Sequence, residues 1–586
     1  MIETLAADAM AIPLPEGWPA LSLGEVEALL CAPGGKFEIE SVAINGVPTR
    51  VWKHAPASLA DLARLGATHG DATFLIYEDE RVSFDAWFRA VAAMAEHLSA
   101  LGVSKGDRVA LAMRNLPEWP VTFFAVTVLG AICVPLNAWW TGGELAYGLT
   151  NSGAKVLVCD AERLERIAPH RAELPALEHV IVARLAGHAP QGVARLEDAI
   201  GAVAGYVSLP ARALPAGAIA PDDPATILYT SGTTGHPKGA LGSHRNLATN
   251  ILTSAYTAAR SILRRGDPIP DVSNGLGRKT ILTVVPMFHA TACSATMMGA
   301  IAAGHTMVFM RKWDTVQAMQ LIARERVNMT GGVPTIAWQL LEHPDRAQYD
   351  LSSLESIAYG GAPSAPELVR RIHAEFGALP GNGWGMTETS ATVTGHSGED
   401  YLNRPTSAGP PVPVADLRIT AEDGVTLLPS GEVGELWARG PMIVHGYWAN
   451  PEASAATFVD GWVRTGDLAR VDDDGFLYVV DRAKDIVIRG GENIYSSEVE
   501  NVLYAHPAVT DAAVVGLPHR TLGEEPAAVV HCAPGTSASE SELQDWVRER
   551  LAGFKVPVRV LFLDETLPRN ANGKILKKDL KALFAA

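Results

Sequence analysis

The sequence predicts an α/β fold with a large, multi-layer α/β N-terminal domain and a small, mobile α+β C-terminal domain. Apolar runs of strand length alternate with helical patterns over most of the chain, as in layered parallel sheets. Residues 485–586 mix short strands and helices in a different pattern. The chain has 586 residues, and single hydrophobic cores stop growing at roughly 250–300 residues. We therefore expect more than one structural unit.

Four apolar runs have the length and composition of buried strands. They are DRVALAM (107–113), AKVLVCD (154–160), HVIVA (179–183) and KTILTVVPM (279–287). Residues 82–102 carry apolar side chains at helical spacing, which predicts an amphipathic helix. Continuous apolar strands that alternate with helices indicate parallel sheets covered on both faces.

One stretch, Trp119 to Trp140, has no charged residue and is long enough for a membrane span. Pro120 suits the start of a helix, Gly130 suits its end, and AICVPL has the pattern of a short buried strand. We expect a buried helix and strand here. Peripheral membrane contact stays open if the substrate is a lipid.

The pattern changes near Asp481–Lys484. Beyond this point AAVVGLP and PAAVVHCA predict strands, and ESELQDWVRERL predicts a helix. We therefore predict a large domain at 1–480, a hinge at 481–484 and a small domain at 485–586. Residues 1–50 are predicted to form an N-terminal extension packed on the main body.

Charge and cysteine content exclude several classes of protein. The formal net charge of −17 repels phosphate backbones, so nonspecific nucleic acid binding is excluded. Five scattered cysteines without a CxxC pair give neither a zinc pattern nor a disulfide framework. An acidic N-terminus without a basic segment gives no secretory signal. We predict a reduced, cytoplasmic setting.

The strongest local signal is the loop YTSGTTGHPKGA at 229–240, which follows the short strand TIL. Its glycines allow positive φ and turn backbone N–H groups inward, and its hydroxyls and lysine add donors. Such a loop can cradle phosphates, although GKS or GKT of the Walker pattern is absent. The candidate ligands are Thr230, Ser231, Gly232, Thr233, Thr234, Gly235 and Lys238.

This loop resembles the signature loop of the adenylate-forming superfamily, which contains acyl-CoA synthetases, firefly-type luciferases and nonribosomal adenylation domains. Six further motifs resemble those of the superfamily and follow in its order: PMFHA (286–290), YGGAP (359–363), GWGMTET (383–389), RTGDLA (464–469), DRAKDIVIRGGENIYSSEVE (481–500) and PRNANGKILKK (568–578). The resemblance implies an ATP-dependent acid–CoA ligase. Such an enzyme forms an acyl-adenylate and pyrophosphate, then an acyl-CoA thioester and AMP.

The resemblance also implies a nucleotide site. Glu388 would hold Mg²⁺, which prefers oxygen ligands, and Thr387 would bond the α-phosphate. Asp467 would hold the ribose hydroxyls, and Arg482 would also reach the nucleotide. Trp384 replaces the family's usual Tyr, so its indole can stack on adenine but lacks the phenol oxygen. One wall of the adenine slot would come from Gly360, Gly361, Ala362 and Pro363.

Two candidate catalytic residues would be unremarkable without the resemblance. His289, read alone, is a core histidine, and Lys574 is a solvated lysine. The resemblance places His289 beside the acyl carboxylate and brings Lys574 into the site for adenylation. The small domain would then rotate about Lys484 for transfer to coenzyme A. After this rotation the site would be faced by Gly490, Gly491 and Glu492.

Three alternatives compete with this interpretation. A nonribosomal amino-acid adenylation domain would usually carry an acid after PMFH, and TACSATMMGAIAAG offers none. A luciferase would share the fold, but nothing indicates oxygenation. A non-enzymatic acyl-binding or transport protein on a decayed ligase fold is the third. Joint retention of five residues argues against decay: Lys238, Glu388, Asp467, Arg482 and Lys574.

The acid substrate is predicted from small side chains. Residues 290–293 are small, and Gly331, Gly332 and Val333 resemble a segment of fatty-acyl ligases, which leaves room for a wide pocket. A medium- or long-chain fatty acid is favoured, and aryl, arylalkanoic or polycyclic acids stay open. No charged residue lies at 290–304, so we expect monocarboxylates to react faster than dicarboxylates or amino acids. The predicted partners are this acid, ATP and coenzyme A, with Mg²⁺ as the metal; an oligomer stays open.

Overall fold

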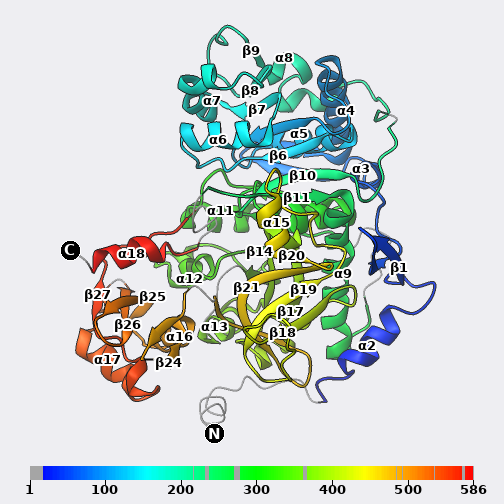
Figure 1. Ribbon diagram of the computed structural model, residues 1–586. Helices are drawn as coiled ribbons and strands as arrows, with labels where there is room; N and C mark the ends of the chain where they lie inside the picture. The colour runs from blue at the N-terminus through cyan, green and yellow to red at the C-terminus, as the bar shows by residue number, and fades with distance from the viewer. Residues whose placement is uncertain are drawn as a thin grey trace.

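A computed structural model describes residues 17–215, 217–230, 236–269, 277–360, 366–482, 485–490, 492–533, 535–570 and 574–584. Within these ranges the chain forms a large α/β body up to Arg482. A smaller α+β unit, called the C-terminal unit below, begins at residue 485 and lies at one side of the body (Figure 1). This arrangement confirms the predicted fold class.

The first large sheet has the strand order β11-β10-β6-β5-β7-β8-β9 in the described chain. Its neighbours are parallel except for β10 and β11, which pair antiparallel. The strands are β5 (Arg108–Ala112), β6 (Ile132–Pro135), β7 (Val156–Asp160), β8 (His179–Ala183), β9 (Val193–Arg195), β10 (Pro224–Tyr229) and β11 (Gly239–Ser243).

This sheet is buried on both faces, which explains its continuous apolar runs. On β7, for example, Val156 and Val158 face one hydrophobic cluster while Leu157 and Cys159 face another. The covering helices are α4 (Phe84–Ala100), α5 (Glu118–Val128) and α8 (Leu196–Ile200) on the first face, and α6 (Gly142–Ser152) and α7 (Ala161–Ile167) on the second.

The uncharged stretch at 119–140 forms most of α5 and all of β6. Its aromatic and β-branched side chains are buried inside the body, except for Trp139, which is 43% exposed. Among the described residues, no helix has the length and apolar character needed to cross a membrane.

The second large sheet has the order β17-β16-β15-β14-β12-β13-β3-β4 in the described chain. Its central strands are parallel, and the pairs β16–β17 and β3–β4 at its two edges are antiparallel. The strands are β3 (Thr73–Tyr77), β4 (Glu80–Ser83), β12 (Thr280–Thr283), β13 (Thr306–Phe309), β14 (Met329–Gly332), β15 (Ser356–Gly360), β16 (Leu379–Met386) and β17 (Ala391–Ser397).

Helices separate the two sheets and cover the outer face of the second. The inner ones are α3 (Leu59–Ala67), α9 (His244–Arg265) and α10 (Met298–Ala303), which share one core with α4 and α5. The outer ones are α11 (Thr315–Glu325), α12 (Pro334–Glu342) and α13 (Pro366–Phe376). A short helix, α14 (Glu399–Asn403), follows β17. The body is thus layered as predicted for a multi-layer α/β domain.

Two smaller groups complete the body. A third sheet holds β18 (Asp416–Thr420), β19 (Gly434–Arg439), β20 (Phe458–Val459), β21 (Trp462–Val471) and β22 (Leu477–Arg482), with α15 (Pro451–Thr457) beside it. Near the N-terminus, α2 (Leu23–Leu30) and the hairpin β1 (Ile39–Ile44) and β2 (Val47–Trp52) pack on α9, as Figure 1 shows. There the Trp52 indole donates to Thr253 Oγ1 at 3.2 Å.

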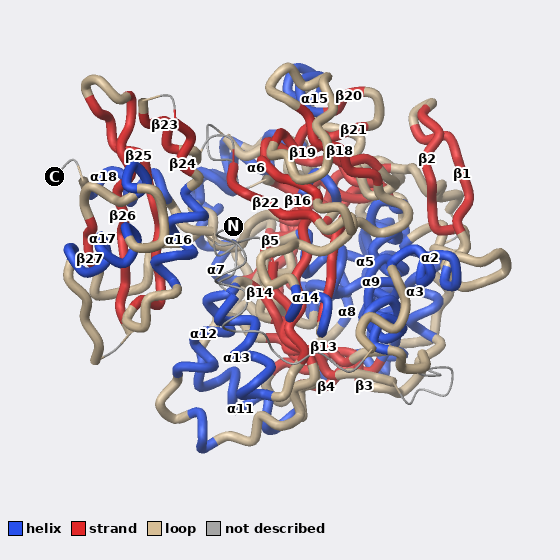
Figure 2. The backbone as a smooth tube through the Cα atoms, turned by 90° about the horizontal axis from the view of Figure 1, so that it is seen from below, coloured by secondary structure: helices blue, strands red, loops and turns tan. Residues whose placement is uncertain are grey.

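The C-terminal unit has its own core and stands beside the body in Figure 2. It contains β23 (Val487–Arg489), β24 (Glu492–Ile494), β25 (Val509–His519), β26 (Gly523–Cys532), β27 (Val560–Phe562), α16 (Ser496–Tyr504), α17 (Glu540–Arg548) and α18 (Lys577–Leu583). The predicted hinge at 481–484 begins with the last two residues of β22 and ends before β23. Ala483 and Lys484 lie outside the described residues, and the domain border stays a prediction.

Candidate active site

One cavity of about 2010 Å³ lies where the three sheets of the body face the C-terminal unit. Glu388 and Asp467 are the only carboxylates among its described lining residues. The lining residues that the sequence had singled out are Thr230, Lys238, His289, Gly331, Gly332, Val333, Gly360, Trp384, Thr387, Glu388, Asp467, Arg482 and Lys574. These residues come from distant parts of the chain, and the fold brings them together.

Thr230 and Lys238 mark the two ends of the glycine-rich loop between β10 and β11. The backbone N–H of Thr230 donates to the Lys238 carbonyl at 2.8 Å, and the Lys238 N–H donates to Thr230 Oγ1 at 3.3 Å. The Lys238 ammonium lies 4.9 Å from the centre of the Tyr447 ring. A cation is therefore held at the mouth of the loop, where an anionic ligand could be bound.

Glu388 lies in a short 3₁₀ turn, Thr387–Thr389, directly after β16. It is only 7% exposed, and its Oε1 accepts a hydrogen bond from the Tyr447 hydroxyl at 2.6 Å. No group of three or more His, Cys, Asp or Glu side chains in the described chain could hold a metal alone. Mg²⁺ usually takes one or two carboxylates together with substrate phosphates. A single buried carboxylate that shares a contact, Tyr447, with the candidate phosphate-binding Lys238 fits that requirement.

Asp467 on β21 is held from two sides. Its Oδ2 accepts from the Trp384 indole N–H at 2.8 Å, and its Oδ1 lies 3.3 Å from Arg482 Nε. Asp467 and Arg482 are direct cross-strand partners on β21 and β22. The carboxylate is 6% exposed and keeps lone pairs for further donors, such as a pair of vicinal hydroxyls.

His289 lies between β12 and a π-helix at Thr291–Met297. Burial, with a further contribution from the charge of Lys574, lowers the pKa of His289 to about 4. The ring is therefore neutral near pH 7. Its Nδ1 accepts from the Thr291 backbone N–H at 3.2 Å, which places the ring proton on Nε2. His289 can thus donate a hydrogen bond into the cavity.

Lys574 belongs to the C-terminal unit and enters the same cavity. Beside it Arg569 and Ile575 form an antiparallel β-bridge, and Asn570 Oδ1 accepts from the Lys574 N–H at 3.0 Å. Arg569 pairs with the buried Asp511 at 2.6 Å, which ties this segment to the core of the C-terminal unit. Lys574 and His289 thus line one cavity from two different units, and the charge of Lys574 contributes to the lowered pKa of His289.

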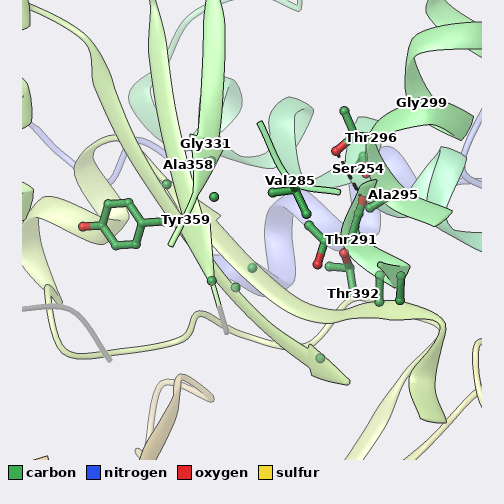
Figure 3. Close-up of a pocket in the computed structure, with 18 of the residues that line it drawn as sticks. Ser254, Val285, Thr291, Ala295, Thr296, Gly299, Gly331, Ala358, Tyr359 and Thr392 are labelled. Carbon is green, nitrogen blue, oxygen red and sulfur yellow. Dashed lines mark hydrogen bonds between the residues drawn. The ribbon is translucent and has the colours of Figure 1, made fainter. Parts of the chain in front are cut away.

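Many of the lining residues drawn in Figure 3 have small side chains, and Tyr359 is the largest of those labelled. One side is formed by α9 and the π-helix, the other by β14 and β15. Gly331 is required in this wall, because a Cβ there would lie 2.0 Å from the Ala358 carbonyl oxygen. The labelled residues include Ser254, Val285, Thr291, Ala295, Gly299 and Thr392. The hydroxyls of Ser254, Thr291 and Thr392 bond to no residue that the structure describes.

Comparison with known proteins decides the family. Residues 62–448 match the AMP-binding enzyme family model, and residues 498–574 match the AMP-binding enzyme C-terminal domain. The chain belongs to the AMP-binding enzyme family. It is an AMP-forming acyl-CoA ligase, so the predicted acid–CoA ligase activity is confirmed and the non-enzymatic alternative is set aside.

Three similar proteins illustrate the range of this family. A Mycobacterium tuberculosis (strain ATCC 25618 / H37Rv) 3-[(3aS,4S,7aS)-7a-methyl-1,5-dioxo-octahydro-1H-inden-4-yl]propanoyl:CoA ligase is 38% identical, over 90% of this chain and 98% of its own. A long-chain-fatty-acid–CoA ligase of M. tuberculosis (strain CDC 1551 / Oshkosh) is 35% identical, over 84% and 91%. The crystal structure of the anthranilate CoA ligase AuaEII with anthranoyl-AMP has a TM-score of 0.80 and 26% identity, and covers 90% and 98%.

Several residues predicted for the ligase site are not described or lie elsewhere. Gly490 and Glu492 are described but do not line the cavity in this arrangement. The predicted residues outside the described ranges are Ser231, Gly232, Thr233, Thr234, Gly235, Gly361, Ala362, Pro363, Lys484 and Gly491. Their roles stay predictions.

Sequence reasoning missed two features of the ligase site. Tyr447 was not singled out, although it contacts both Glu388 and Lys238; the only signal was an aromatic residue after glycine in the loop that follows β19. Trp384 was assigned to adenine alone. Its bond to Asp467 depends on packing of the second sheet against the third, which the local sequence does not reveal.

Proposed function

We propose that this ligase activates a bulky, uncharged carboxylic acid that carries neutral oxygen substituents, such as keto or hydroxyl groups. The supporting observation is the wall with the open hydroxyls of Ser254, Thr291 and Thr392. A plain hydrocarbon would exclude water from these hydroxyls without replacing its hydrogen bonds. That costs about 1–3 kcal/mol for each buried, unpaired group. An oxygenated acid would pair with them.

The relatives are compatible with this substrate class. One is named for a bicyclic dioxo acid with a propanoyl chain, and AuaEII binds an aromatic acyl-adenylate. A medium- or long-chain fatty acid is the second candidate. It is favoured by the apolar lining residues Ile251, Ala258 and Val285 and by the long-chain relative.

In the first proposed step, a carboxylate oxygen of the acid attacks the α-phosphorus of ATP, and pyrophosphate leaves. Lys238 and Thr230 would bind phosphate oxygens, and Thr387 would bond the α-phosphate. Lys574 would neutralise charge between the carboxylate and the α-phosphate. Mg²⁺, held by Glu388, would supply charge neutralisation on the phosphates.

The remaining lining residues would position both substrates for this step. Asp467 would accept from the ribose hydroxyls, with its carboxylate oriented by Trp384 and Arg482. Gly360 and the indole of Trp384 would border the adenine. His289 would donate its Nε2 proton to an oxygen of the acid, which orients the carboxylate without consuming a proton.

In the second proposed step, the C-terminal unit rotates about Lys484 and withdraws Lys574. The sulfur of coenzyme A then bonds to the acyl carbon, the thiol proton is lost, and AMP leaves with the electron pair of the broken C–O bond. Gly490, Gly491 and Glu492 would face the site after rotation. A cytoplasmic location is proposed with this function, because the five cysteines are free thiols.

Pyrophosphate release over a panel of acids tests the substrate class. A keto- or hydroxyl-bearing polycyclic acid should exceed a saturated fatty acid of equal carbon number by about tenfold in kcat/KM, equivalent to about 1.4 kcal/mol. Amino acids should fail, because no carboxylate lies near the acyl wall. The panel should include dicarboxylates, which are expected to react more slowly than monocarboxylates although Lys36, Arg265 and Arg278 also line the cavity.

Matched variants connect the preference to the hydroxyls. Ser254→Ala and Thr392→Val should reduce the advantage of the oxygenated acid, because they remove open donors. Thr296→Val is the control, since that hydroxyl already donates to the Thr291 carbonyl at 3.2 Å. A higher rate with the fatty acid, unchanged by the first two variants, would replace the oxygenated acid with the second candidate.

A further inference from the structure

Residues 444–448, the loop that follows β19, tie the phosphate side of the site to Glu388. Three backbone hydrogen bonds of 2.7–2.9 Å join this loop to β11, the strand that follows the glycine-rich loop. In addition, the Val444 N–H donates to the Glu388 carbonyl at 3.0 Å. One segment therefore fixes the spacing between β11 and the 3₁₀ turn of Glu388.

Tyr447 is the side chain that this loop directs into the cavity. Its hydroxyl donates to Glu388 Oε1 at 2.6 Å, and its ring lies 4.9 Å from the Lys238 ammonium. Phe458 supports the ring edge-on, with the ring centres 5.4 Å apart. Tyr447 is only 9% exposed. One buried side chain thus contacts both the candidate metal ligand and the candidate phosphate-binding cation.

We propose that Tyr447 is a positioning residue for the metal–phosphate end of the ATP site. This inference rests on the proposed roles of Glu388 and Lys238. The phenol occupies Oε1 and so fixes the plane of the carboxylate, which leaves Oε2 for a cation. The ring face restricts the flexible Lys238 side chain to positions near the loop.

The protonation state of Tyr447 is compatible with this role. Burial, followed by the negative charge of Glu388, raises the pKa of the Tyr447 phenol well above its usual range. The hydroxyl is thus the donor in its 2.6 Å bond to Glu388 Oε1. Groups that orient a metal ligand in this way typically change metal affinity about 10–100-fold when they are removed.

The test separates the hydroxyl from the ring. Tyr447→Phe removes only the hydroxyl, and we expect Mn²⁺ to bind about tenfold more weakly in the presence of a non-hydrolysable ATP analogue, as followed by electron paramagnetic resonance. The KM for the acid should not change, and excess Mg²⁺ should restore much of the adenylation rate. Tyr447→Leu removes the ring as well, so the KM for ATP should rise further.

Tyr478→Phe is the matched control. Its hydroxyl donates to Asp472 Oδ2 at 3.1 Å, and it does not line the cavity. It should leave Mn²⁺ binding at the wild-type value. Melting curves establish that each variant is folded before binding is compared.

Glu388→Gln separates the positioning role of Tyr447 from the metal-binding role of Glu388. If it weakens Mn²⁺ binding and Tyr447→Phe does too, the positioning role is supported. If Glu388→Gln weakens Mn²⁺ binding but Tyr447→Phe matches the wild type, the positioning role is overturned while the proposed function stands. If Glu388→Gln binds Mn²⁺ normally, the metal role of Glu388 fails, and the positioning role fails with it.

Discussion

The nucleotide side and the C-terminal side of the cavity are built in different ways. Asp467 and Glu388 are buried, and each is held by hydrogen bonds that cross between sheets of the body. Lys574 instead belongs to a unit with its own core. In the proposed mechanism, the groups needed throughout the reaction are thus fixed by the body, whereas the group needed for one step is carried by a separate unit.

The largest expected effect tests the separate unit. Lys574→Ala removes a donor aimed at developing phosphate charge, which commonly costs about 3 kcal/mol, or roughly 10²–10³ in rate. Acyl-adenylate formation, measured by pyrophosphate release, should fall by that factor. Transfer from preformed acyl-adenylate to coenzyme A should continue near the wild-type rate.

The control for that experiment is Lys581→Ala. Lys581 lies on α18 of the same unit and pairs with Glu524 at 3.2 Å, but it does not line the cavity. Both steps should survive this change. If Lys574→Ala lowers the rates of adenylation and of transfer to coenzyme A by the same factor, Lys574 does not act in one step only.

The second prediction concerns how the stability of the nucleotide side of the body depends on pH. His396 on β17 is 3% exposed, and burial lowers its pKa to about 3. Its Nε2 bonds the Ser407 carbonyl at 2.9 Å, while its buried Nδ1 has no partner in the described chain. The native ring stays neutral, whereas the unfolded ring binds a proton below pH 6.5. The free energy of unfolding therefore decreases as pH falls from about 6.5 towards 3, and at pH 5 this histidine has lowered it by about 2 kcal/mol.

Urea unfolding of the body at pH 7 and pH 5 measures this loss. His396→Asn lacks the titrating ring, so it should be less stable at pH 7 but lose less on acidification. An equal pH dependence in the two proteins would show that other groups control the acid stability of this side.

The third prediction concerns the connection between the sides. Lys484→Pro fixes φ near −65° and restricts the preceding residue, which should hinder rotation. Thioester formation should fall about tenfold while adenylation persists, as expected when a domain motion limits one step only. Lys484→Ala keeps the backbone free and serves as the control. A Lys484→Pro enzyme with normal thioester formation would place the pivot elsewhere.

The smallest expected effect concerns ATP binding at the nucleotide side of the cavity. Trp384→Phe keeps an aromatic ring beside the nucleotide but removes the N–H that orients Asp467. Loss of one hydrogen bond of about 1 kcal/mol should raise the dissociation constant of ATP about fivefold. Calorimetry can measure this dissociation constant. Trp437→Phe is the control, because the Trp437 indole donates to Thr420 Oγ1 at 3.1 Å and does not line the cavity. Equal affinities in the two variants would leave Asp467 positioned by Arg482 alone.

The sequence predicted the strands and the helix of the body well because burial on two faces leaves continuous apolar runs. DRVALAM became β5, HVIVA became β8, and the helix predicted at 82–102 became α4. KTILTVVPM was only half a strand: β12 ends at Thr283, and the rest leads to His289. Val284, Val285 and Pro286 instead line the cavity, so their apolar side chains form part of its wall and not part of a buried strand.

The candidate site was predictable only where a motif is contiguous. Glu388, Asp467 and Lys574 each stand in such a motif, and the structure places all three at one cavity. Ser254 and Tyr447 could not be found in this way. Ser254 is one of many small residues on a long helix, and which face of α9 borders a cavity depends on the helices packed around it.

Helix α9 presents Ile251, Ser254, Ala258 and Ile262 to the cavity. Positions three or four apart lie on one face, about 5.4 Å along the axis for each turn. In the proposed complex, the acid would lie along this face of the helix. A bulky side chain at one of these positions would shorten the space left for the acid. Because the positions lie about one turn apart, the choice of position would set how much space remains, and Glu388 and Asp467 would not be changed. Chain-length selectivity could therefore be changed stepwise in this enzyme, independently of its chemistry.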